Sequence, residues 1–283
     1  MRTYQHLSMI TLALVIATPV GAQSADEWKS WPTIDNWSIG AGYFVPDLHT
    51  QLVVTDEEGN LGTGINFEQN LGLDGSKATG LLYVNWHWAM RHALEYRYFQ
   101  LNRSAAGTST VSIGIGDAVF DVDLPIQSFF DITAHEIAYS YSVLLDERKH
   151  LYLGLGISLQ DLALGIQGTE SSPNPGEPLS TQLASTAPLP TLNIGFDYAF
   201  TDKWIFVSRF GWLAVELDFA ADESLSGEII NANAGIQWNA FENVGFILQY
   251  QLFDVGVDYL AEGVHFAVDY DYRGPVLGVV VNF

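Results

Sequence analysis

Five charged residues could do chemistry in an otherwise apolar setting: Glu95, Arg97, Glu136, Asp197 and Arg209. Each falls on the polar side of a stretch in which large apolar residues alternate with small or polar ones. Opposite charges in a confined interior form ion pairs, because an unpaired charge there is strongly disfavoured. We therefore predict a structural polar network, with control of ion passage through a pore as the alternative role of the two arginines.

A serine hydroxyl beside a histidine base is the second arrangement that could do chemistry. Residues two apart lie on the same face of a strand, so a His-x-Ser segment would bring the two side chains together. The only such segment is His6-Leu7-Ser8, and neither His87 nor His135 is followed by a serine two residues on. The sequence thus favours a protein without catalytic residues and leaves an enzyme as an alternative.

Carboxylates gather at two further places in the sequence. Asp56-Glu57-Glu58-Gly59-Asn60 could hold Ca²⁺ through oxygen ligands, and Asp269 and Asp271 follow His265 closely, as a peptide hydrolase would require. The spacing of an EF-hand loop and an adjacent pair of aspartates are both absent. Because charge runs usually stay hydrated, we expect solvated surfaces here, no metal ion and no cofactor.

The composition excludes several classes of protein. Of the 283 residues 48% are hydrophobic and 16% are charged, against roughly 25% charged in ordinary soluble domains. Such a chain does not stay disordered, and its net charge of −22 disfavours binding to nucleic acid. Cysteine is absent, which excludes disulfides and thiolate metal sites. The low content of charge suggests that much of the surface does not face water.

The N-terminus has the features of an export signal. Arg2 precedes a short apolar stretch, Met9–Ala17, and small residues lead up to Ala22. The stretch is shorter than the ~20 apolar residues of a membrane-spanning helix. We predict a signal peptide over residues 1–22, a polar lead-in over 23–36 and a single membrane domain over 37–283.

Alternation with a period of two dominates the rest of the chain. Large apolar residues occupy every odd position from Leu151 to Leu159 and every even position from Leu192 to Phe200, which predicts strands with one apolar face. That face would point inward in a soluble sandwich and outward to lipid in a membrane barrel. Spans of about ten residues and aromatic residues beside short turns favour the barrel. The aromatic residues concerned are Trp86, Trp88, Trp204, Phe206, Trp238 and Phe241.

The C-terminal segment supports the same interpretation. Gly274–Phe283 ends in an aromatic residue with apolar residues at alternate positions before it, and so resembles the last strand of Gram-negative outer-membrane β-barrels. Tyr198–Trp204 is similar to a tight periplasmic turn of that superfamily. The resemblance implies a bacterial outer-membrane location, contact with membrane lipid and lipopolysaccharide, and a role for Phe283 as the signal read by the barrel-assembly machinery.

The lengths of the connections predict the topology. Very short turns near Met90-Arg91, Asp146–Lys149, Thr201-Asp202 and Glu242-Asn243 alternate with longer connections, as in outer-membrane barrels. One of the longer connections, Gly165–Thr186, has the prolines and glycines of coil. We count ten strands, which begin near Trp37, Gly80, His92, Ser128, His150, Pro190, Lys203, Glu228, Val244 and Val264. In a twelve-strand alternative, Gly64–Leu71 and Val111–Asp121 would also span.

These observations together predict an all-β, monomeric, transmembrane antiparallel barrel. Its expected function is structural, or that of a small-solute channel with a largely filled polar lumen. An enzyme acting on lipid or peptide, and a recognition scaffold that uses long extracellular loops, are the alternatives.

Overall fold

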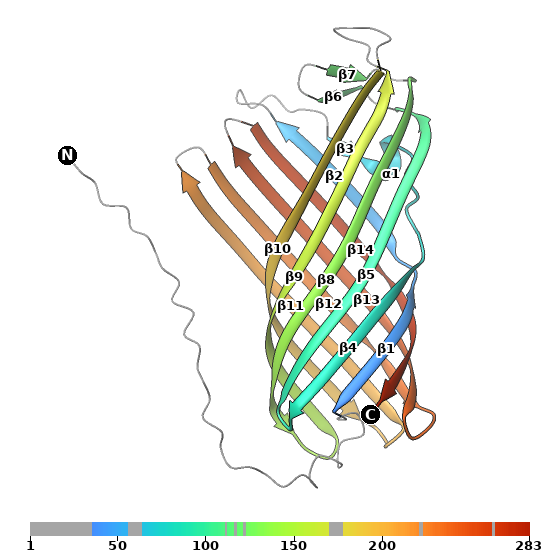
Figure 1. The fold of residues 1–283 in the computed structure, drawn as a ribbon, viewed down its shortest axis with the longest axis vertical. Helices are drawn as coiled ribbons and strands as arrows, with labels where there is room; N and C mark the ends of the chain where they lie inside the picture. Colours follow the sequence, from blue (N-terminus) through green and yellow to red (C-terminus); the bar gives the residue numbers. More distant parts are fainter. Residues whose placement is uncertain are drawn as a thin grey trace, which may run out of the picture.

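The computed structural model describes residues 36–55, 64–110, 112–115, 118–120, 123–169, 178–220, 223–261 and 264–283. Within them the chain forms an antiparallel β-barrel of ten strands (Figure 1). The barrel strands are β1 (Trp37–Phe44), β4 (Thr79–Ala89), β5 (His92–Thr108), β8 (Pro125–Leu145), β9 (Lys149–Thr169), β10 (Pro178–Ala199), β11 (Trp204–Ala220), β12 (Glu223–Asn239), β13 (Val244–Ala261) and β14 (Val264–Asn282). The predicted signal peptide and nearly all of the lead-in lie outside the described residues.

Hydrogen bonding between the first and last strands closes the barrel. β1 pairs with β14 from Ser38↔Asn282 to Phe44↔Val276. The backbone N–H of Trp37 donates to the carbonyl of Phe283 (3.2 Å), and the N–H of Phe283 donates back (2.8 Å). The prediction of a closed ten-strand barrel is confirmed. In the part of the chain that the structure describes, no helix is long and apolar enough to cross a membrane.

The two segments that could have made twelve strands do not span the barrel. Gly64–Leu71 contains only the short strand β3 (Ile65–Asn66) and the helix α1 (Phe67–Asn70). Val111–Asp121 contains β6 (Ile113–Ile115) and β7 (Ala118–Phe120), which pair with each other and not with the barrel wall. The twelve-strand alternative is therefore wrong.

Alternation places large apolar side chains on the outside of the barrel. Leu155 on β9, Leu248 on β13 and Leu277 on β14 are 52%, 60% and 61% exposed. In a transmembrane barrel such a belt contacts the lipid, while the residues between face the lumen. The apolar face of each strand thus points outward, as the prediction of a membrane barrel requires, and not inward as in a soluble sandwich.

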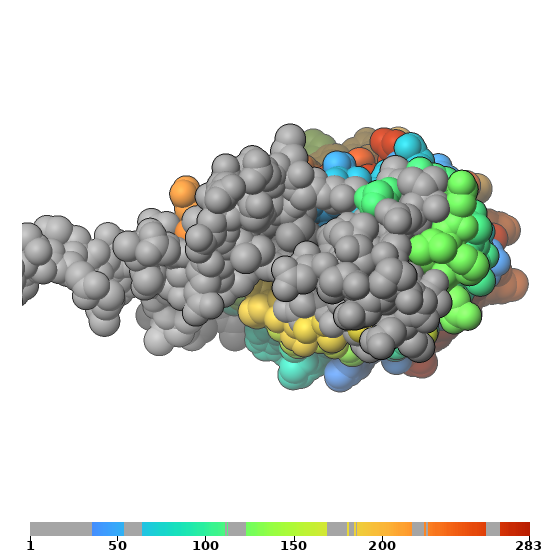
Figure 2. Space-filling view, turned by 90° about the horizontal axis from the view of Figure 1, so that it is seen from above, coloured from blue at the N-terminus to red at the C-terminus, as the bar shows by residue number. Residues whose placement is uncertain are grey.

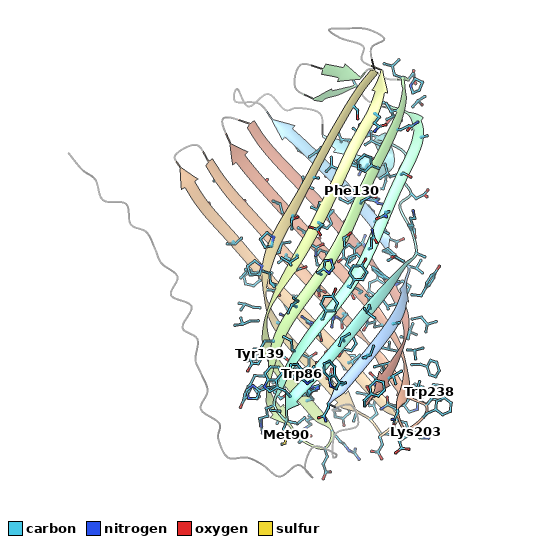
Figure 3. All side chains as sticks on the ribbon, in the orientation of Figure 1. Trp86, Met90, Phe130, Tyr139, Lys203 and Trp238 are labelled. Atoms are coloured by element: carbon cyan, nitrogen blue, oxygen red, sulfur yellow. The ribbon has the colours of Figure 1, made fainter. Side chains whose placement is uncertain are left out.

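Aromatic side chains gather outside the barrel at one end, which we call the turn end because it carries the short turns. Trp37 stacks on Trp86 with ring centroids 5.4 Å apart, and Trp204 stacks on Trp238 at 5.8 Å. Figure 3 shows Trp86, Tyr139 and Trp238 at this end. Amphipathic rings of this kind prefer the boundary between lipid and water, so they mark one edge of the membrane.

The opposite end, which we call the loop end, rises beyond the apolar belt. β8, β9 and β10 have 21, 21 and 22 residues, about twice the 9–11 that a tilted spanning strand needs. The coil predicted over Gly165–Thr186 is therefore partly wrong, because β9 continues to Thr169 and β10 starts at Pro178. From above, light green residues of β8 and yellow residues of β10 form part of the rim at this end (Figure 2).

A segment between β1 and β4 folds into the barrel at the loop end. Past Pro46 the chain continues as β2 (Asp47–Thr55), which pairs with β14. Helix α1 then begins where the side chain of Asn66 accepts a hydrogen bond from the backbone of Gln69 (2.7 Å). Phe67 of α1 is fully buried and meets the inward-facing Phe130 edge to face, with centroids 5.6 Å apart. The segment thus fills this end of the lumen.

The lumen changes character along the barrel axis. Its turn end is lined by polar side chains, whereas its loop end is one cluster of buried apolar residues that includes Leu48, Phe67, Phe99, Phe130, Ile132, Leu164, Phe253 and Tyr270. The inward positions of the upper strands carry these apolar residues, while outward ones such as Asn102, Asp131 and Asp269 are polar, so this half packs as a core. The polar lumen that the sequence predicts occupies only the turn end.

β10 and β11 separate toward the loop end. Their ladder runs from Ala199↔Ile205 to Leu192↔Trp212 and stops there, although both strands continue, and the two diverge in Figure 1. The backbone N–H of Ala199 points toward β9, since it donates to Arg148 (2.9 Å). Because backbone N–H groups alternate between the two edges of a strand, those of the even-numbered residues of β10 point toward β11. Pro188 and Pro190 are even and have no N–H to donate. The two missing donors on one strand edge explain where the wall opens.

A charge placed on the lipid-facing belt tests the depth assigned to these strands. Leu155→Arg should destabilise the folded barrel by about 2–4 kcal/mol, because Leu155 faces lipid midway along the spanning part of β9. Val143→Arg is the matched control: Val143 is also exposed on the outside, but it lies beside a turn, where the cost falls to about 0–1 kcal/mol. Urea unfolding midpoints in lipid vesicles measure both. Equal shifts would contradict the assigned depths.

Candidate functional site

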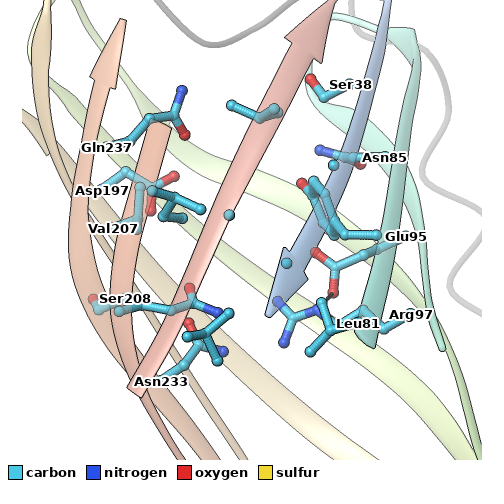
Figure 4. Close-up of a pocket in the computed structure, with 18 of the residues that line it drawn as sticks. Ser38, Leu81, Asn85, Glu95, Arg97, Asp197, Val207, Ser208, Asn233 and Gln237 are labelled. Atoms are coloured by element: carbon cyan, nitrogen blue, oxygen red, sulfur yellow. Dashed lines mark ion pairs between the residues drawn. The ribbon is translucent and has the colours of Figure 1, made fainter. Parts of the chain in front are cut away.

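The polar turn end of the lumen encloses a cavity of about 150 Å³ (Figure 4). Strands from all around the barrel supply its lining, among them Ser38 on β1, Asn85 on β4, Arg97 on β5, Asp197 on β10 and Asn233 on β12. Inward positions of every strand converge here because the side chains alternate across a closed sheet. The cavity is therefore a candidate site for a small polar molecule.

Glu95 lies between two arginines in this lining. Its Oε1 atom accepts from Arg97 Nε at 3.0 Å and also pairs with Arg209 Nη1. Arg209 donates from Nε and Nη2 to Oδ1 of Asn193 (3.3 and 3.1 Å). The guanidinium of Arg97 lies over the ring of Tyr83, 5.8 Å from its centroid. One carboxylate, one amide and one ring thus hold two cations in place.

The remaining two residues of the predicted network have other partners. Glu136 accepts a hydrogen bond from Nδ2 of Asn231 (2.8 Å), whose Oδ1 accepts from Gln251 (3.2 Å). Asp197 contacts Nδ1 of His150 at 3.1 Å. The structure therefore places all five predicted residues in one polar lumen, but only Glu95, Arg97 and Arg209 form direct ion pairs with one another.

Sequence reasoning missed a hydrogen-bonded row of three side chains at the turn end. Nε2 of His150 lies 2.8 Å from Oγ of Ser142, and Nδ1 of the same ring lies 3.1 Å from Oδ2 of Asp197. The three residues come from β8, β9 and β10. A search along single strands for His-x-Ser could not find them, because the partners face each other across neighbouring strands.

The hairpin between β8 and β9 sets the first two members of this row opposite each other. The backbone N–H groups of Arg148 and Lys149 donate to Oδ1 of Asp146 (2.9 and 2.7 Å), which closes the turn and lowers the pKa of that carboxyl. A bulge at Val143 shifts the register between Ser142↔Tyr152 and Leu144↔Leu151. Both Ser142 and His150 are left buried on the lumen side.

The other carboxylates singled out in the sequence do not assemble into a site. Asp271 pairs with His49 at 3.5 Å, and both lie on the outer face, since Tyr270 and Tyr272 beside Asp271 face inward. The acidic run at residues 56–60 lies outside the described residues. Among those described, no group of three or more histidine, aspartate or glutamate side chains could hold a metal ion.

Comparison with known proteins identifies a fold and no family. No model of a known protein family matches the chain, and no curated protein matches its sequence. The outer membrane protease OmpT of Escherichia coli is 10% identical, with a TM-score of 0.55, and the match covers 89% of this chain and 100% of OmpT. The toluene transporter TodX of Pseudomonas putida is 10% identical over 89% of this chain and 91% of TodX, with a TM-score of 0.36.

A third similar structure is the attachment invasion locus protein Ail of Yersinia pestis, 11% identical over 86% of this chain and 99% of Ail, with a TM-score of 0.28. At such identities the likeness to OmpT shows the fold alone, and the two lower scores carry no argument about this chain. The protein has the fold of outer-membrane β-barrels, as its sequence predicts.

Removing the carboxylate shared by the two arginines tests the ion network. Glu95→Gln should lower the free energy of unfolding by about 3–5 kcal/mol, because it leaves two buried cations without their counterion. Glu242→Gln is the control, since Glu242 is exposed in a short turn and its substitution should change stability by no more than about 0.5 kcal/mol. Denaturant unfolding measures both. A near-neutral Glu95→Gln would mean that water and not Glu95 screens the arginines.

Proposed function

We propose that this protein is a structural barrel of the bacterial outer membrane whose lumen is closed, and not a permanently open channel. The observation that carries the proposal is a layer of aromatic rings above the polar cavity. Phe130 of β8 lies 6.1 Å from Tyr270 of β14, and Phe253 of β13 stacks on Tyr272 at 4.5 Å. β5, β4 and β1 separate β8 from β14 around the barrel, so Phe130 and Tyr270 meet across the lumen, while Phe253 and Tyr272 are paired neighbours on adjacent strands.

Two further features support a closed lumen. Helix α1 packs against the same aromatic layer from the loop end, through Phe67 and Phe130. Glu68 of α1 pairs with Arg103, a buried inward residue of β5, and accepts the backbone N–H of Thr50 (2.9 Å). An inserted segment held by a buried ion pair is not free to move aside without leaving charges unpaired.

The apolar belt and the aromatic ring at the turn end support the membrane placement. The turn end would face the periplasm and the loop end the exterior, with the belt against lipid and the outer rim against lipopolysaccharide. Because β1 and β14 pair over their full common length, one chain completes the sheet without a second copy. We therefore propose a monomer that needs the barrel-assembly machinery for insertion.

Electrical recording in planar bilayers tests whether the lumen conducts. The purified protein should give no stepwise conductance, because the aromatic layer leaves no continuous water path. Replacing Phe130 and Phe253 with alanine together should produce a measurable leak, whereas Phe246→Ala, a lipid-facing aromatic on the same strand as Phe253, should not. Regular porin-like steps from the unaltered protein would overturn the closed-lumen proposal in favour of a small-solute channel.

The terminal aromatic residue tests the proposed route to the membrane. Phe283→Asp should lower the amount of heat-modifiable, folded protein in the outer membrane several-fold, since the resemblance assigns recognition by the assembly machinery to this residue. Phe283→Tyr should restore it, because it keeps an aromatic ring at the terminus. The same yield from all three chains would remove Phe283 as an assembly signal.

A further inference from the structure

Ser142, His150 and Asp197 are hydrogen-bonded in a row in the same way as the serine, histidine and aspartate of acyl-transfer enzymes. The serine hydroxyl contacts Nε2 of the histidine (2.8 Å), and the aspartate contacts Nδ1 (3.1 Å). We propose that these three residues form a hydrolytic site for small acyl esters that enter the polar lumen from the turn end. Such a site is recognised by the geometry and roles of its members and not by their order in the chain.

The hydrogen bonds define the roles of the two ring nitrogens. An ionised carboxylate can only accept, so Nδ1 of His150 carries the proton and donates to Asp197. Nε2 is then the unprotonated nitrogen and accepts from the hydroxyl of Ser142. This is the tautomer in which a histidine can act as the base for a serine nucleophile. Asp197 is a positioning residue, since it acts through His150.

Neighbouring groups fix the orientation of the histidine ring. The ring of Tyr152 packs on His150 with centroids 4.9 Å apart. A Cβ atom at Gly195 would collide with the ring of Tyr152, so this position accepts only glycine without moving the tyrosine. A buried tyrosine and a glycine that makes room for it thus hold the base on the line between Ser142 and Asp197.

The surroundings offer room for an acyl group and a cation for the oxyanion. His150, Tyr152 and Asp197 line the cavity of about 150 Å³ described above, whereas Ser142 lies outside the lining, two residues beyond the lining residue Ser140 on the same inward face of β8. A substrate therefore has to reach the serine past His150, which limits it to a short acyl chain. Nη1 of Arg91 donates to the backbone carbonyl of Ser142 (2.8 Å). In the proposed site this guanidinium, which is held at the backbone of Ser142, supplies the positive charge that stabilises the developing carbonyl oxyanion of the ester.

The reaction needs no cofactor. Oγ of Ser142 forms a bond to the carbonyl carbon of the ester while its proton passes to Nε2 of His150. The bond from that carbon to the alkoxy oxygen breaks, and the alcohol leaves with the proton from His150. Water then gives a proton to His150 and its hydroxyl to the acyl carbon. The bond between the acyl carbon and Oγ of Ser142 then breaks, and Oγ takes the proton back from His150 as the carboxylic acid departs. The products are one alcohol and one acid.

Labelling with a fluorophosphonate probe tests the proposal on the full-length folded protein in detergent micelles. The probe should attach to Ser142, seen as a single added mass in the intact protein and located by peptide mapping. Ser142→Ala and His150→Gln should abolish the labelling. Ser158→Ala is the control, because Ser158 is an equally buried inward serine of β9 outside the row. Heat modifiability shows that each variant is folded.

Hydrolysis of p-nitrophenyl acetate separates a catalytic role from a structural one. Asp197→Asn should lower kcat by roughly 10⁴-fold with little change in KM, because the amide favours the wrong histidine tautomer. A protein that is folded but neither labelled at Ser142 nor active overturns the proposal, and so does labelling that survives in folded His150→Gln. This result is independent of conductance, so the closed-lumen proposal can fail while the hydrolytic site stands, and the reverse.

Discussion

Every backbone N–H and C=O inside the apolar belt must find its partner within the protein, because lipid offers none. Closure of the sheet between β1 and β14 meets this requirement, and much of the structure follows from it. It forces alternate side chains into a confined lumen, where a charge such as Arg209 has to be paired. The same requirement means that neighbouring strands can leave backbone hydrogen bonds unformed only beyond the apolar belt. Accordingly, β1 gives way to β2 at Pro46, and β10 leaves β11 above Leu192, both toward the loop end.

The two ends of the confined lumen are filled in different ways. At the turn end, polar side chains pair with one another: Glu95 with two arginines, Asn193 with Arg209 and Asn231 with Glu136. At the loop end, apolar inward residues pack with the inserted α1. An ion that left the polar chamber for the apolar core would lose its polar partners, which is the physical basis of the closed-lumen proposal.

Strand alternation made most of the wall predictable from sequence, since one residue of slip would have turned Leu155 inward. Short turns such as Asp146–Lys149 likewise predicted ten strands correctly. The inserted segment was not predictable, because nothing in Phe67 or Leu71 says whether an apolar side chain meets lipid or core. The contact of His150 with Ser142 was missed for another reason. It depends on the register between two strands and on a bulge at Val143, and neither can be recognised from the residue pattern of a single strand.

The two ends of the barrel differ in how firmly they can hold a side chain. At the loop end the β10–β11 ladder is absent, and Pro188 and Pro190 remove the donors that would restore it. At the turn end all ten ladders are formed, and the backbone pairing His150↔Asp197 is continuous with the pairing up to Pro178. Chemistry that requires hydrogen bonds held within a few tenths of an ångström therefore belongs at the turn end, where closure fixes the strands on both sides of the histidine.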